Sequence, residues 1–158
     1  MSQQEERSGL RTVAVVAWLR LMRVFRRVEQ VAAAELRCQG LSLAQFDVLA
    51  RVGAAEGVIQ RDIAEGLLVT KGNVTQLLGR MERCGWLERR QVGRSKRLYL
   101  TARGRALYRE VVPAHEALIA AQLGALDAAE QRQLHRLLRT LDRSLERRET
   151  DSSIRRGS

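Results

Sequence analysis

Residues 62–101 hold the most informative part of this sequence, DIAEGLLVTKGNVTQLLGRMERCGWLERRQVGRSKRLYLT. Thr70 can cap a helix that runs to about Cys84, where Gly85 stops it. Apolar residues recur in this helix at helical spacing, namely Val74, Leu77, Leu78 and Met81. One face of the helix is therefore expected to join a core while its polar side chains point elsewhere. A shorter helix is expected just before it, from Ile59 to Leu67.

The hydrophobic period changes after Gly85. Trp86 to Glu88 and Leu98 to Leu100 flank a basic loop over residues 91–96, which contains Gly93. Alternation on both sides of a glycine-containing loop predicts a β-hairpin. Two short helices followed by a basic hairpin form a winged helix-turn-helix pattern.

Positive charge is concentrated in the same region. Between residues 58 and 105 there are eleven Lys and Arg against four Asp and Glu, which accounts for most of the chain's net charge of +10. A clustered basic excess favours a polyanionic partner. Nucleic acid fits this pattern better than a membrane surface.

Long helices are expected on both sides of this unit. Before it, an apolar stripe runs from Ala14 to Ala32 along a helix that ends near Gly40. Ser42 and Gln45 then have capping-box spacing and open a further helix. After it, Thr101 begins a helix in which Pro113 is expected to cause a kink.

A last helix opens with a second capping-box pair, Asp127 and Glu130, and carries a stripe of leucines from Leu134 to Leu145. A small central unit cannot cover the apolar stripes of both arms. A second copy of the chain would cover them.

Composition excludes several classes. The chain has 158 residues, which suits one domain, and its 45% hydrophobic content rules out global disorder, while 4% aromatic residues and one proline favour helices. No apolar run reaches the roughly 20 residues that a membrane span needs, and the polar start MSQQEER does not resemble a secretory signal. We therefore expect a cytoplasmic protein.

Catalytic and metal-binding patterns are not found. The sequence has no glycine-rich phosphate loop and no nucleophile elbow, so no enzyme and no cofactor are predicted. Cys38 and Cys84 match no zinc spacing and are expected to be reduced thiols, although redox sensing by Cys84 stays open. His115 and His135 have no partners at ligand spacing, so no metal site is expected.

The sequence resembles the MarR family of transcriptional regulators. The resemblance lies in residues 41–49 (LSLAQFDVL), 62–75 (DIAEGLLVTKGNVT) and 81–89 (MERCGWLER), followed by 94–101 (RSKRLYLT), which looks like the wing returning into the next helix. Their order and spacing between long flanking helices make the match specific. It implies a mainly α fold, a winged helix-turn-helix with long N- and C-terminal dimerisation helices and a small β-hairpin wing.

The resemblance also implies a homodimer that places one recognition helix per subunit in the major groove and a wing along the minor groove. Asn73, Thr75 and Gln76 are then candidate base readers. Thr70, Lys71 and Arg80 are candidates for phosphate contacts or for mixed contacts to phosphates and bases. Arg94 occupies the wing-tip position, where a narrow minor groove attracts a guanidinium. The remaining DNA-binding candidates are Ser95, Lys96, Arg97 and Arg61.

Three positions depart from the usual family pattern. Val92 stands where an acidic residue often precedes the wing arginine, and Gly79 stands where an aspartate commonly precedes the helix arginine. Ile59 replaces a capping Ser or Thr, a role that Gln60 or Arg61 can take over.

Ligand sites in this family lie between the first helix and the DNA-binding unit. Trp18 and Phe46 are the candidate ligand-binding residues, and for both the alternative is packing in the core or, for Trp18, in the dimer interface.

These observations predict one MarR-like domain over residues 1–150. Residues 10–40 and 102–149 are expected to form the dimerisation helices, 41–101 the winged helix-turn-helix unit, and 151–158 a disordered tail. The expected function is that of a ligand-responsive repressor acting as a homodimer on a palindromic operator in double-stranded DNA. The alternative is a basic helical protein that binds structured RNA or the ribosome.

Overall fold

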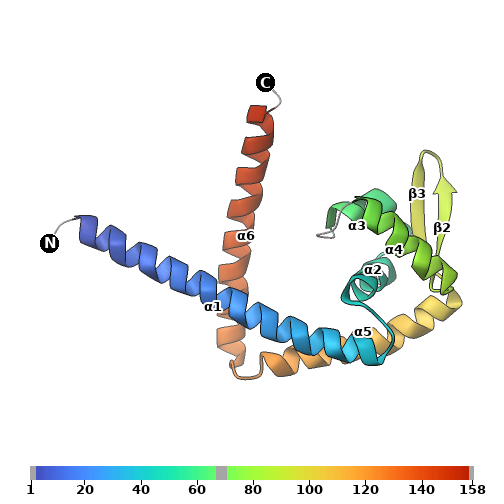
Figure 1. Cartoon of the computed structure of the whole chain (residues 1–158), viewed down its shortest axis with the longest axis horizontal. Coiled ribbons are helices and arrows are strands. Elements are labelled where there is room, and N and C mark those ends of the chain that lie inside the picture. Colours follow the sequence, from blue (N-terminus) through green and yellow to red (C-terminus); the bar gives the residue numbers. More distant parts are fainter. Residues whose placement is uncertain (1–2, 67–70, 157–158) are drawn as a thin grey trace. The chain divides into compact units, whose positions relative to one another are not determined.

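The computed structural model describes residues 3–66 and 71–156, and the side chains of residues 13–64 and 73–148. Contacts divide the chain into two units, Met1–Ile119 and Ala120–Ser158. The first unit contains, in chain order, α1 (Gln3–Cys38), α2 (Leu43–Ala54), β1 (Val58–Ile59), α3 (Gln60–Gly66), α4 (Lys71–Arg83), β2 (Leu87–Val92), β3 (Ser95–Leu100) and most of α5 (Ala102–Gln122) (Figure 1). The second contains the end of α5 and α6 (Ala128–Arg156). The predicted mainly α winged helix-turn-helix is confirmed.

The core of the first unit is built mainly from α2, α4 and the sheet. As expected from their spacing, the apolar residues of α4 are buried, and they meet residues of α2 and of both long strands in one cluster that includes Val48, Leu49, Val52, Val74, Leu77, Leu78, Met81, Leu87, Leu98 and Leu100. Leu36 of α1, Ile63 of α3 and Val111 of α5 also belong to it. This packing fixes which face of α4 points away from the protein.

The start of α2 is held by the predicted capping box. The Ser42 hydroxyl accepts from the Gln45 backbone N–H at 3.2 Å, and the Gln45 side chain accepts from the Ser42 N–H at 2.8 Å. Two N–H groups that an isolated helix would leave unpaired are satisfied in this way.

The hairpin differs from the expected one in the length of its loop. Val92 pairs with Ser95, so only Gly93 and Arg94 form the turn, and residues 91, 92, 95 and 96 lie in strands instead of in a loop. Gly93 has φ +59° and Arg94 has no positive φ, the pattern of a two-residue type II′ turn, which matches the twist of paired strands. The wing is therefore a continuous ribbon that carries Arg94 at its tip.

A third strand was not predicted. Val58 pairs with Leu98 and Ile59 with Arg97, which makes a three-stranded antiparallel sheet in the order β1-β3-β2. The expected helix from Ile59 to Leu67 therefore begins one residue later, at Gln60, because Ile59 belongs to β1. The edge strand β1 links α3 directly to the wing.

The second unit is dominated by α6. Its predicted capping box is confirmed, since the Asp127 carboxylate accepts from the Glu130 N–H at 2.9 Å and the Glu130 carboxylate accepts from the Asp127 N–H at 2.9 Å. Of the leucine stripe, Leu137, Leu138, Leu141 and Leu145 are exposed within a single chain.

The tail prediction differs from the structure. Residues 151–156 were expected to be disordered, yet α6 continues to Arg156. Neither glycine nor proline occurs between Gly124 and Gly157, so the sequence supplies no helix breaker in this stretch. Among the described helices, including this one, none is long and apolar enough to cross a membrane.

Candidate nucleic-acid interface

The outer face of α4 carries four of the predicted DNA-binding residues. Asn73, Thr75, Gln76 and Arg80 are all exposed, on the sides of the helix that the core does not use. Lys71 is the first residue of α4, and its side chain lies outside the described ones; Thr70 lies outside the described residues altogether. The exposed side chains offer hydroxyl, amide and guanidinium groups along a rigid helix.

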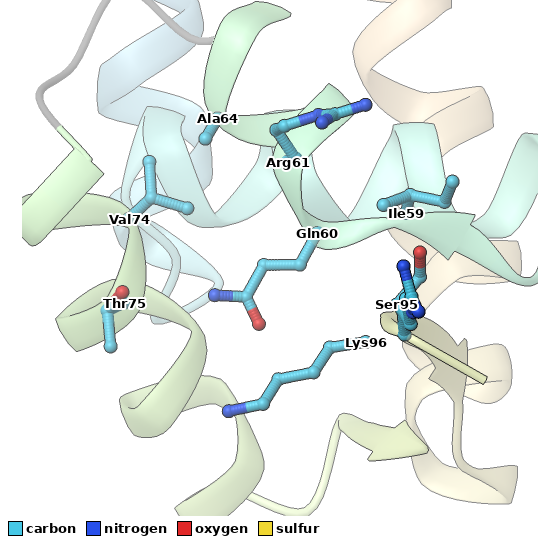
Figure 2. A pocket seen from close by; sticks show the side chains of 9 residues that line it. Ile59, Gln60, Arg61, Ala64, Val74, Thr75, Ser95 and Lys96 are labelled. Carbon is cyan, nitrogen blue, oxygen red and sulfur yellow. The ribbon is translucent and has the colours of Figure 1, made fainter. Parts of the chain in front are cut away.

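A cavity of about 400 Å³ opens between α3, α4 and the hairpin. It is lined by Ile59, Gln60, Arg61, Ala64, Val74, Thr75, Arg94, Ser95 and Lys96. Five of these nine were predicted to bind DNA from sequence alone: Arg61, Thr75, Arg94, Ser95 and Lys96. Figure 2 shows Thr75 on α4 and Lys96 on the hairpin, with Gln60 extending into the space between these elements. Three segments that are distant in sequence thus present cationic and hydroxyl groups to one opening.

Gln60 has a distinctive place in this cavity. Its Oε1 atom is buried and has no hydrogen-bond partner among the described residues. A buried amide oxygen without a partner is unfavourable, so the site is suited to an incoming hydrogen-bond donor or an ordered water. The sequence suggested Gln60 only as a substitute cap, because nothing in its local pattern indicates that β1 and the hairpin would enclose it.

Arg97 does not line the cavity. Its side chain is half-buried, and Nη1 donates to the Gly57 carbonyl oxygen at 2.8 Å. This bond joins β3 to the residue before β1. The geometry gives Arg97 a structural role in holding the wing, beside the DNA-binding role that was predicted for it.

An acidic residue, Glu82, connects α4 to the wing. Its carboxylate accepts from the Arg89 backbone N–H at 3.1 Å and forms a charge-assisted hydrogen bond with the Arg89 guanidinium. The hydrogen bond from Arg89 lowers the pKa of Glu82, against an opposing effect of burial, and the charges of Arg89 and Lys96 lower it further. This pair joins the end of α4 to the start of β2. No rule of sequence spacing would have indicated the contact between Glu82 and Arg89.

We expect this clamp to make the protein sensitive to acid. Because the folded pKa of Glu82 is lowered, its stabilising effect is fully present above the unfolded pKa of about 4.3 and is lost as pH falls through the folded value. Glu82→Gln should therefore be less stable at pH 7 and show a flatter loss of stability below about pH 5. Urea unfolding at a series of pH values measures both effects.

The matched control is Glu88→Gln, which removes the same charge from the more exposed Glu88–Arg90 pair. This variant should keep the steep acid dependence of the wild type. If the free energy of unfolding of Glu82→Gln fell below pH 5 as steeply as that of the wild type, the pair with Arg89 would contribute nothing to stability.

The two candidate ligand-binding residues lie in different environments. Trp18 is 57% exposed and, with Leu19, Met22, Arg23, Arg26, Arg27 and Gln30, borders a shallow hollow of about 590 Å³ along α1. Phe46 is in the core, 9% exposed, and its ring centroid lies 4.1 Å from that of His115 on α5. Phe46 thus fills the core role that was its alternative, while Trp18 is available to a partner or a ligand.

The described residues contain no group of three or more His, Cys, Asp or Glu side chains that could hold a metal ion. Cys38 and Cys84 are both free thiols in the structure. The exposed face of α4 and the cavity beside it offer hydrogen-bonding and cationic side chains.

Comparisons with known proteins agree with this geometry. The sequence model of the MarR family matches residues 39–98, from the end of α1 to the wing. An HTH-type transcriptional regulator of Bacillus cereus that has no assigned role is 30% identical over 139 residues, which cover 87% of this chain and 95% of the relative. The chain belongs to the MarR family.

Solved structures of MarR-family proteins share the fold. That of the Mycobacterium tuberculosis MarR family protein RV2887 in complex with salicylic acid is 31% identical with a TM-score of 0.63, and the match covers 77% of this chain and 92% of that one. Streptococcus pneumoniae FabT in complex with DNA is 25% identical with a TM-score of 0.71, covering 84% and 97% of the two chains. This MarR-family chain is therefore a transcriptional regulator, a class distinct from enzymes.

Proposed function

We propose that this MarR-family regulator is a homodimer that binds a palindromic operator in double-stranded DNA and represses transcription until a small molecule releases it. In this proposal α4 lies in the major groove, with Asn73, Thr75 and Gln76 toward base edges and Arg80 toward the phosphates. The wing lies along the backbone and inserts Arg94 into the minor groove.

The observation that carries the proposal is the shared opening between α3, α4 and the wing. Arg61 on α3 and the pair Arg94 and Lys96 on the wing come from two separate segments, and all of them border the cavity next to the exposed face of α4. Such a cluster places positive charge where the two DNA strands would flank an inserted helix. FabT, which has the same fold, was solved with DNA bound.

The exposed apolar faces of the arms support a homodimer. Trp18, Leu19 and Phe25 on α1 are all more than half exposed, and α6 exposes its leucine stripe. Soluble proteins rarely leave so many large apolar side chains in water on continuous faces, so an interface is the simplest explanation. A twofold dimer would present two α4 helices, so the target that we propose for it is palindromic.

The structure of RV2887 with salicylic acid supports the small-molecule part of the proposal. In this chain the hollow on α1 combines the aromatic ring of Trp18 with the guanidinium groups of Arg23, Arg26 and Arg27. An aromatic ring and a guanidinium suit a planar anion, through stacking and a charge-assisted hydrogen bond. Repression would follow from operator occupancy, and release from a ligand that favours a dimer geometry unable to span both half-sites.

Gln76→Ala tests the reading of bases by α4. On a duplex selected from random DNA, we expect this variant to lose discrimination at one base pair in each half-site, by about 1–3 kcal/mol, while overall fold and dimerisation are kept. Affinities for all single-base variants of that duplex measure the effect. Gln133→Ala on α6 is the matched control, and a Gln76→Ala ranking identical to the wild type would show that Gln76 does not read bases.

A further inference from the structure

Gly79 lies in the third turn of α4 and has no structural explanation within the protein. Glycine is among the poorest residues for the interior of a helix, because it has more backbone freedom to lose on folding than alanine. Its backbone at position 79 is not in the left-handed region, unlike that of Gly85 at the end of the same helix. Any residue other than proline could therefore adopt the conformation of Gly79.

Packing within the chain does not require glycine there either. A Cβ atom built on Gly79 would have Arg83 Nη1 at 3.6 Å as its nearest neighbour, an ordinary van der Waals contact with the end of a flexible side chain. Gly104, by contrast, lies directly against the backbone of Trp86. Within the free protein, the space above Gly79 is therefore bordered by the movable end of the Arg83 side chain and by no backbone atom of another element.

The position of Gly79 on α4 indicates what could use this space. With about 100° per residue, Gly79 lies within roughly 30° of the line opposite the buried face of the helix. Three exposed side chains surround it: that of Arg80, the next residue, and those of Gln76 and Arg83, which lie three residues before and four residues after it. The missing side chain therefore leaves a notch in the outer face of α4, bordered by an amide and two guanidinium groups.

The charge around the notch suits an anion. Neither the Arg80 nor the Arg83 guanidinium is paired with another described residue, so both can act outside the chain. When a recognition helix enters the major groove, its N-terminal residues face the base edges, which leaves its later turns near the sugar–phosphate backbone at the edge of the groove. Gly79, Arg80 and Arg83 belong to those later turns.

We propose that Gly79 lets the third turn of α4 approach a backbone phosphate of the operator closely, so that Arg80 and Arg83 can bind this phosphate. The inference rests on the proposed function, because it needs α4 to lie in the groove of duplex DNA. Gly79 would then increase the affinity for DNA, although glycine lowers the stability of the helix.

The test compares stability and DNA binding in the same variants of the full chain. Gly79→Ala should raise the unfolding temperature, because alanine favours the helix, yet bind the selected duplex about tenfold more weakly. The slope of log affinity against log salt concentration should become shallower by about one, as expected for one lost phosphate contact. Gly79→Leu should bind more weakly still.

Ala106→Gly on α5 is the matched control, since Ala106 is exposed and lies outside the candidate interface. It should lower the unfolding temperature and leave DNA binding unchanged. The double variant Gly79→Ala/Ala106→Gly should return to near wild-type stability and keep the tenfold loss in binding.

Three outcomes would overturn the inference. Gly79→Ala that binds the duplex as tightly as the wild type would show that the notch is not used, while the proposed function would stand. Weaker binding accompanied by a lower unfolding temperature would show that the methyl group disturbs the protein itself. A wild-type chain that selects no duplex DNA would overturn the proposed function and the inference with it.

Discussion

Replacing Leu138 and Leu141 by glutamate is expected to produce monomers that bind operator DNA at least about a hundredfold more weakly. Both side chains are exposed in the single chain, at 40% and 47%, in the middle of the α6 stripe. A second copy would bury them, and carboxylates at these positions would have to lose their hydration without a partner, which costs several kcal/mol per charge. A monomer also offers a single α4 and loses the gain that comes from linking two half-site contacts.

Light scattering gives the subunit number, and fluorescence anisotropy with a selected duplex gives the affinity. The matched control is Gln133→Glu/Thr140→Glu, which adds two glutamates to α6 at exposed positions about 100° around the helix from the centre of the leucine stripe. This control should remain dimeric and bind DNA within a few-fold of the wild type. A Leu138→Glu/Leu141→Glu protein whose mass stays at two subunits would place the interface elsewhere.

Gly104→Ala is expected to lower the free energy of unfolding by about 3 kcal/mol or more. A Cβ atom at this position of α5 would overlap the carbonyl oxygen of Trp86 and lie 2.7 Å from its carbonyl carbon. These are backbone atoms, so a side-chain rotation cannot relieve the overlap. The same carbonyl accepts the Thr101 N–H at 3.1 Å, and the Thr101 hydroxyl accepts the Gly104 N–H at 3.0 Å, so a shift of α5 would break the cap of the helix as well.

Urea unfolding measures this loss, and Gly79→Ala serves as the control, since it makes the same substitution in a helix where there is room. The two variants should move stability in opposite directions. If Gly104→Ala were as stable as the wild type, the close contact of α5 with Trp86, the residue just before β2, would not exist in solution.

Local sequence rules predicted the helices of the fold well. Ser42 with Gln45 and Asp127 with Glu130 are capping pairs that act over three residues, and both occur as expected. The buried face of α4 followed from the spacing of Val74, Leu77, Leu78 and Met81 for the same reason. Each of these patterns depends on residues within one or two helical turns.

The features that the sequence did not predict depend on distant residues. A strand of two residues, Val58–Ile59, is too short to show alternation and exists only because β3 offers it an edge. Gln60 lines the cavity because that pairing brings α3 beside the wing, and Glu82 meets Arg89 because Gly85 turns the chain back on α4. The charge cluster was visible in the sequence, whereas its assembly around one opening required the fold.

The most direct test of the account is a selection of bound sequences from random duplex DNA, with a pool of structured RNA offered in parallel. We expect a palindromic consensus in duplex DNA, occupied by two chains, with half-site centres about one helical turn, or roughly 10 base pairs, apart. Enrichment of RNA with no consensus in duplex DNA would contradict it, since α4 and the wing would then not be reading a double helix.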